Sequence, residues 1–149
     1  MDRFEAVLRT SAHIEQLTRI RDLVCTAARH TGFEGVHMNH VELAVEEACM
    51  NIINHAYARR DGGYLEVQVR SERGRRLTIV LIDCGQSFDP ASACTYDPSQ
   101  PLEGSQQVGF GLYLMRCLMD ELKFEFGITT SEERCGGQPF NRLTMVKNL

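Results

Sequence analysis

The sequence predicts an α+β domain, a two-layer α/β sandwich with helices on one face of a mixed, mostly antiparallel sheet. Two long segments with helical apolar spacing follow a first short strand-like segment. Two consecutive strand-like segments come next, and a further helix and two closing strands follow a long polar connection. Helices and strands that are grouped, rather than strictly alternating, favour helices packed on an antiparallel sheet. A length of 149 residues fits one domain covering residues 1–149.

The first half of the chain contains the longest helical patterns. Residues 4–10 alternate and predict a strand. Residues 13–30 have apolar residues at helical spacing, and Gly32 and Gly35 end that pattern. Residues 37–58 predict a longer helix, whose apolar stripe consists of Val41, Val45, Ala48, Ile52 and Ala56.

The second half supplies the remaining strands and one unusual connection. Residues 64–70 and 77–83 predict a hairpin, and the second strand is so uniformly apolar that we expect it at the centre of the sheet. Residues 84–108 contain three of the four prolines and no lysine or arginine. Connections this long are usually functional lids or disordered segments, and we expect a lid at about 86–108. A helix from Gly109 to about Asp120 and strands at 121–127 and 142–147 complete the domain.

Composition excludes several classes of function. The net charge is −4, and the most basic stretch, residues 70–76, is expected to be a solvated hairpin turn, so nucleic-acid binding is disfavoured. No charged segment followed by a long apolar run opens the sequence, so we expect no signal peptide, no membrane helix and a cytoplasmic location. The six cysteines form no C-x-x-C pair. We expect them to be reduced thiols that mostly fill the core, which disfavours a redox or metal-binding protein.

Glu47 and Asn51 form the first candidate site. They are four residues apart in the helical segment 37–58, so they share a face of that helix. A carboxylate can accept a proton from an attacking hydroxyl, and an amide oxygen is a suitable ligand for Mg²⁺. The alternative is structural: a solvated ion pair for Glu47 and a cap or buried hydrogen bond for Asn51.

Two further short motifs contain candidate ligand-binding residues. Asp83 follows a buried strand and needs a donor such as an exocyclic amine, and Gly85 permits a close approach; the alternative is a turn after the strand. Gly109 and Gly111 open an apolar helix, whose N-terminal N–H groups can bind phosphate. A G-x-G pair alone is weak evidence for a nucleotide site. Neither a dinucleotide-binding fingerprint nor a P-loop is present in the sequence.

Taken in order, the three motifs resemble those of the GHKL, or Bergerat-fold, ATPase superfamily, which includes gyrase, histidine kinases and MutL. The finer resemblance is to the small anti-sigma-factor serine/threonine kinases of bacteria. Residues 47–57 resemble their N box, residues 83–90 their G1 box and residues 109–120 their G2 box. Histidine kinases are disfavoured because no phosphoacceptor histidine on a dimerising helix pair precedes these motifs.

The resemblance implies a role for each matching residue. Glu47 would be the general base, and Asn51 would coordinate Mg²⁺ that bridges the ATP phosphates. Asp83 would bind the adenine amine, with Gly85 shaping the base pocket. The remaining nucleotide contacts would come from Gly109, Gly111, Leu112 and Thr144, of which the two glycines would also provide the lid hinge.

The resemblance also implies partners. The chain would bind a sigma factor, with Arg19 and Arg21 near the contact, and would phosphorylate a STAS-type anti-anti-sigma protein with Mg·ATP. It would form a homodimer through its first strand and helix. Gln107 stands where some relatives have a basic residue, and residues 77–115 contain no lysine or arginine. This lack of cationic charge supports an alternative, a non-catalytic ATP-binding module that controls a regulatory partner.

Overall fold

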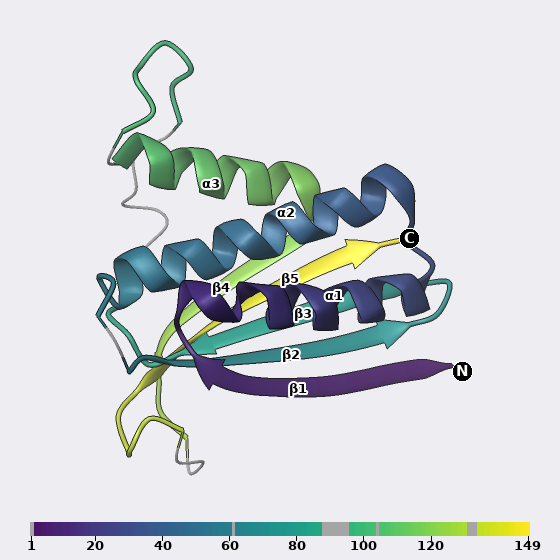
Figure 1. Cartoon of the computed structure of the whole chain (residues 1–149), viewed down its shortest axis with the longest axis horizontal. Coiled ribbons are helices and arrows are strands. Elements are labelled where there is room, and N and C mark those ends of the chain that lie inside the picture. The colour runs from purple at the N-terminus through teal and green to yellow at the C-terminus, as the bar shows by residue number, and fades with distance from the viewer. Residues whose placement is uncertain (1, 61, 88–95, 104, 131–133) are drawn as a thin grey trace.

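The computed structural model describes residues 2–60, 62–87, 96–103, 105–130 and 134–149. Five strands form one sheet in the order β1-β2-β3-β5-β4, and every pairing among them is antiparallel. The three α-helices of the described residues all lie on one face of that sheet (Figure 1). The predicted two-layer α+β fold is therefore confirmed. The strands are β1 (Arg3–Ser11), β2 (Tyr64–Glu72), β3 (Arg76–Asp83), β4 (Glu121–Ile128) and β5 (Phe140–Asn148).

Strand β3 lies at the centre of the sheet, as its apolar sequence predicts. Its partners are β2 on one side and β5 on the other. Leu77, Ile79 and Leu81 are fully buried in the main core, because alternate residues of a strand point to the same face. On β5, Leu143 and Met145 point to this same helix-covered face.

The helices are α1 (Leu17–Thr31), α2 (Gly35–Asn51) and α3 (Ser105–Leu118). A short 3-10 helix, Ile14–Gln16, precedes α1. Gly32 ends α1 with a φ of 120°, and its N–H donates to the carbonyl oxygens of Ala28 and Arg29. Helix α2 packs between α1 and α3 above the sheet (Figure 1).

Helix α2 ends in a π-helical turn, Ile52–Ala56, directly after Asn51. Turns of this kind are rare and frequently occur at functional sites. The Tyr57 hydroxyl then joins three segments: it donates to the carbonyl oxygen of Tyr64 at 2.6 Å and accepts from the N–H of Cys84 at 2.7 Å. Tyr57 thereby attaches the end of α2 to the start of β2 and the end of β3.

Helix α3 begins four residues before Gly109, the residue expected to open it. Residues 105–108 of the expected lid are therefore helical, and residues 96–103 extend above this end of α3 (Figure 1). The expected lid residues 88–95, which include Cys94, and residue 104 lie outside the described residues. No helix in the described part of the chain is long and apolar enough to cross a membrane.

Candidate nucleotide site

The N-box and G2-box residues meet where α2 faces α3. A Cβ atom added to Gly111 would lie 2.8 Å from Oε2 of Glu47 and 3.8 Å from Oδ1 of Asn51. Glu47 and Asn51 thus share the face of α2 that lies against Gly111. Any side chain at residue 111 would enter the space that the Glu47 carboxylate occupies.

The environment of Glu47 favours its neutral form. Burial raises the pKa of Glu47, and the negative charge of the neighbouring Glu46 raises it further. A carboxylate with a raised pKa is a stronger base than an ordinary glutamate, which suits a group that must accept a proton near neutral pH.

Asp83 lies at the end of β3 and is 6% exposed. Its Oδ1 accepts hydrogen bonds from the Gly85 N–H at 2.9 Å and from Nδ2 of Asn141 at 3.0 Å. Burial raises the pKa of Asp83, while these two hydrogen bonds act in the opposite direction. Among the described residues no donor reaches Oδ2, which is left to accept a hydrogen bond from a ligand.

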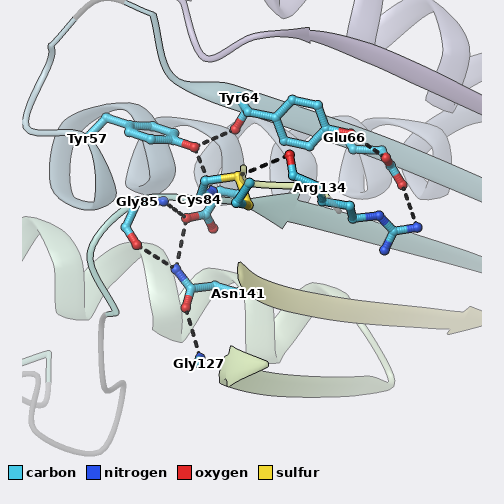
Figure 2. Close-up of a disulfide and its surroundings, with 10 residues drawn as sticks. Tyr57, Tyr64, Glu66, Cys84, Gly85, Gly127, Arg134 and Asn141 are labelled. Carbon is cyan, nitrogen blue, oxygen red and sulfur yellow. Dashed lines mark hydrogen bonds and ion pairs between the residues drawn. A yellow bond between two sulfur atoms is a disulfide. The ribbon is translucent and has the colours of Figure 1, made fainter. Parts of the chain in front are cut away.

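Asn141 was not predicted from the sequence, yet it organises this end of the pocket. Besides Asp83, its Nδ2 donates to the Gly85 carbonyl oxygen at 3.1 Å, and its Oδ1 accepts from the Ser87 hydroxyl at 3.2 Å. Figure 2 shows the Asn141 side chain pointing toward Gly85 and, at its other end, toward Gly127. One sequence signal could have found it: Asn141 is a polar residue at alternate spacing with the apolar Leu143 and Met145, so it faces the same helix-covered side of β5.

Gly85 is required by the protein backbone itself. A Cβ atom there would lie 2.5 Å from the carbonyl oxygen of Ala56, and the next N–H, of Gln86, donates to that oxygen at 2.8 Å. Gly85 therefore shapes the base end of the pocket by letting the chain after β3 pack against the π-helical turn.

One pocket connects Asn51, Asp83 and Asn141, and Glu47 is not part of its lining. It opens between α2, α3 and the ends of β3, β4 and β5, and its lining includes Asn51, Asp83 and Asn141 together with Ala48, Met115 and Phe124. Apolar walls with a few polar groups are typical of small-molecule sites. The Asn51 amide has no hydrogen-bond partner among the described residues, so its oxygen is available as a ligand. This donor set fits an adenine nucleotide with Mg²⁺: Asp83 at the base, and Asn51 with Glu47 at the other end.

Three predicted site residues have other positions. Thr144 pairs with Val80 on β3 and shares the open face of the sheet, so the structure does not bring it to the pocket; Asn141, on the opposite face, contacts Asp83 instead. Leu112 is buried in the main core. Gly109 is buried in the second turn of α3, so the free N–H groups of this helix lie before it, at residues 105–108.

The cysteines depart from the prediction of reduced thiols. Cys84 and Cys135, 51 residues apart, form a disulfide. Its Cα–Cα distance is 5.7 Å, and Figure 2 shows it beside Gly85 and Asn141. The two cysteines are brought together by the pairing of β3 with β5. Their spacing in the sequence does not show that pairing, so it could not predict the disulfide. Cys25, Cys49 and Cys117 are free.

The fold and the pocket define an ATPase domain of the GHKL type. The family model described as a histidine kinase-like ATPase domain matches residues 10–135. Serine-protein kinase RsbW of Bacillus cereus (strain AH187) is 35% identical over 128 residues, which cover 83% of this chain and 79% of the relative. The Bacillus anthracis (strain CDC 684 / NRRL 3495) protein of the same name is 34% identical with the same coverage. The chain therefore belongs to the histidine kinase-like ATPase family, in the group of the RsbW serine-protein kinases.

A solved structure agrees at the level of the fold. The mycobacterial sensor histidine kinase MprB matches with a TM-score of 0.54 over 95% of this chain and 97% of that chain. The sequence identity is 13%, so this likeness concerns the fold alone.

Proposed function

We propose that this protein is an anti-sigma factor and serine/threonine protein kinase. It binds a sigma factor and uses Mg·ATP to phosphorylate a serine or threonine of a STAS-type anti-anti-sigma protein. The observation that carries this proposal is the grouping of Glu47 and Asn51 against Gly111, next to a pocket with Asp83 at its far end. Relatives named serine-protein kinase support the same activity.

Each residue has a defined task in this proposal. Asp83 accepts a hydrogen bond from the adenine amine through Oδ2, while Asn141 holds its Oδ1. Glu47 accepts the proton of the substrate hydroxyl, and its raised pKa makes it a suitable base. Mg²⁺, held by Asn51 and the phosphates, would neutralise charge during phosphoryl transfer.

The assembly is also part of the proposal. Arg19 and Arg21 lie exposed on α1; Arg19 donates to Gln16 at 3.0 Å, and Arg21 lies 3.9 Å from Glu46. These arginines are the proposed contact with the sigma factor. The protein acts in the cytoplasm as a homodimer, and residues 86–108 serve as the lid over the nucleotide.

Intact-mass phosphotransfer tests the proposal. The protein is mixed with Mg·ATP and with STAS proteins from the same genome, and Glu47→Gln serves as the matched variant because it keeps the size of the side chain. We expect one added phosphate on one STAS protein with the native chain, and none with Glu47→Gln, which still binds ATP. Undiminished transfer by Glu47→Gln would exclude this residue as the base.

A second function is favoured by one observation, the absence of lysine and arginine from residues 77–115. A chain whose lid segment carries no cationic side chain can bind ATP and use it only to order a partner-binding surface. In the same experiment, ATP binding and sigma-factor binding without any phosphate transfer would support this non-catalytic module over the kinase.

A further inference from the structure

The Cys84–Cys135 disulfide lies at the base-binding end of the pocket. Cys84 directly follows Asp83, and Cys135 lies six residues before Asn141. Asp83 and Asn141 are the last Cα partners of the β3–β5 ladder, and the disulfide joins the chain just beyond them. The covalent bond therefore closes the end of the ladder that holds the Asp83–Asn141 hydrogen bond.

The fold itself does not depend on this bond. The core contains more than twenty buried apolar residues from the sheet and all three helices, and three described cysteines stay free. Small domains that need disulfides lack such a core. The effect of this disulfide on the folded structure is therefore expected to be local, at the segments that it joins.

Both joined segments already take part in the geometry of the site. The Cys84 N–H donates to the Tyr57 hydroxyl, and so connects the disulfide to the end of α2. On the other side, Arg134 lies 3.6 Å from the buried Glu66 on β2, and its guanidinium lies 5.5 Å from the centre of the Phe140 ring. Figure 2 shows Tyr57 and Arg134 on opposite sides of the disulfide.

We propose that Cys84–Cys135 is a thiol–disulfide exchange site that sets the affinity of the pocket for adenine nucleotide. The oxidised form holds Asp83 against Asn141 and binds nucleotide tightly. The reduced form frees the segment before β5, loosens the last pair of the ladder and binds nucleotide weakly. This inference rests on the proposed nucleotide site.

A dithiol protein or small dithiol is the expected reductant. One of its thiolates attacks a sulfur of the Cys84–Cys135 bond, forms a mixed disulfide and releases the other cysteine, which takes up a proton. The second thiol of the reductant then displaces the remaining cysteine. In total the chain gains two electrons and two protons, and the dithiol loses them as it closes its own disulfide. Both cysteines are partly exposed, so a reductant can reach them.

Calorimetric titration of the full chain with Mg·ATP tests the proposal. We expect the dissociation constant to rise by at least about 5-fold on reduction with dithiothreitol, the lower end of ordinary coupling between two sites. Linkage requires the reverse effect too. The ratio of oxidised to reduced dithiothreitol at which half of the protein's disulfide is reduced must shift, on adding Mg·ATP, by the same factor as the dissociation constant. Peptide mapping without reductant must show the 84–135 link; free cysteines at both positions after oxidation would refute the site.

Two variants separate the exchange site from other effects of the reductant. Cys135→Ser keeps Cys84 native and is expected to bind Mg·ATP weakly whether or not reductant is present. Cys117→Ser removes an exposed free cysteine and is expected to respond like the native chain. Equal affinity in the oxidised and reduced native protein overturns the exchange site alone. No nucleotide binding in either state overturns the proposed function itself.

Discussion

At the scale of single residues, Glu47 shows how the surroundings of a side chain determine its chemistry. It lies on α2 beside Glu46. The Glu46 side chain is about half exposed, and its carboxylate lies 3.9 Å from the Arg21 guanidinium. Burial and the Glu46 charge both raise the pKa of Glu47 above its ordinary value of 4.5. Since both effects disfavour the charged form, the protonated Glu47 persists to a higher pH than an ordinary glutamate.

The pH dependence of phosphotransfer tests this description. A base works only when deprotonated, so transfer is expected to fall as the pH drops through a value above 4.5. Glu46→Gln removes one cause of the raised pKa and should move this acidic limb to lower pH. Glu121→Gln, on β4, removes a charge that does not contribute to the shift, and should leave the limb in place. If the acidic side of the pH profile is unchanged in Glu46→Gln, the group that titrates there is not Glu47. The measurement is kcat/KM against pH for each variant.

Asn141 provides a second prediction for a single residue. Asn141→Ala leaves the buried Asp83 with only the Gly85 hydrogen bond. Losing one hydrogen bond to a buried carboxylate costs about 1–3 kcal/mol, and a loss of this size in binding corresponds to a rise in dissociation constant of about 5- to 150-fold. Thr144→Ala is the matched control, because Thr144 faces the other side of the sheet. Titration with Mg·ATP should show weaker binding for the first variant and unchanged binding for the second; the reverse order would restore Thr144 to the site.

At the scale of secondary-structure elements, the approach of α3 to α2 depends on Gly111. Gly111→Ala places a methyl group 2.8 Å from the Glu47 carboxylate, which must then move. Alanine favours a helix over glycine by about 1 kcal/mol, so stability is expected to stay equal or rise. Misplacement of the base by about 1 Å is expected to reduce transfer by about 100-fold. Urea unfolding and a transfer assay on one preparation measure both.

Gly85→Ala is the opposite case and serves as the comparison. Its methyl group would lie 2.5 Å from the backbone oxygen of Ala56, which cannot rotate away as a side chain can. This variant is expected to unfold at a lower urea concentration than the native chain. If Gly111→Ala is less stable than Gly85→Ala and retains full phosphotransfer, Gly111 is not needed to let α3 approach Glu47.

The elements also show what the sequence alone could predict. The apolar run of β3 predicted its central place, and the four-residue spacing of Glu47 and Asn51 predicted their common face, because both follow from local periodicity. The start of α3 was placed too late, since glycines were read as its opening although they lie inside it. Asn141 and Thr144 are three residues apart and so face opposite sides of β5. Which of the two faces the helices depends on the register of β5 with β3, which local periodicity does not predict.

At the scale of the whole molecule, the disulfide closes a covalent ring in the chain between β3 and β5. The segment between Cys84 and Cys135 contains the proposed lid, all of α3 and β4, so more than a third of the domain folds within this ring. The bond therefore restricts the unfolded chain as well as the end of the β3–β5 ladder. The two effects can be separated by measuring stability and nucleotide affinity independently.

The unfolded-state effect gives a prediction for stability. Closing a loop of this length stabilises a domain by about 2–4 kcal/mol, mainly because it reduces the freedom of the unfolded chain. The double variant Cys84→Ser/Cys135→Ser should therefore lose about this much unfolding free energy in urea, while Cys117→Ser, at an exposed position, should stay within about 0.5 kcal/mol of the native chain. Because the uncrosslinked chain expands further on unfolding, the dependence of its unfolding free energy on urea should also become steeper. A loss of stability without that steeper dependence would mean that the bond acts on the folded state alone, through the contacts of Tyr57 and Arg134 with the two joined segments.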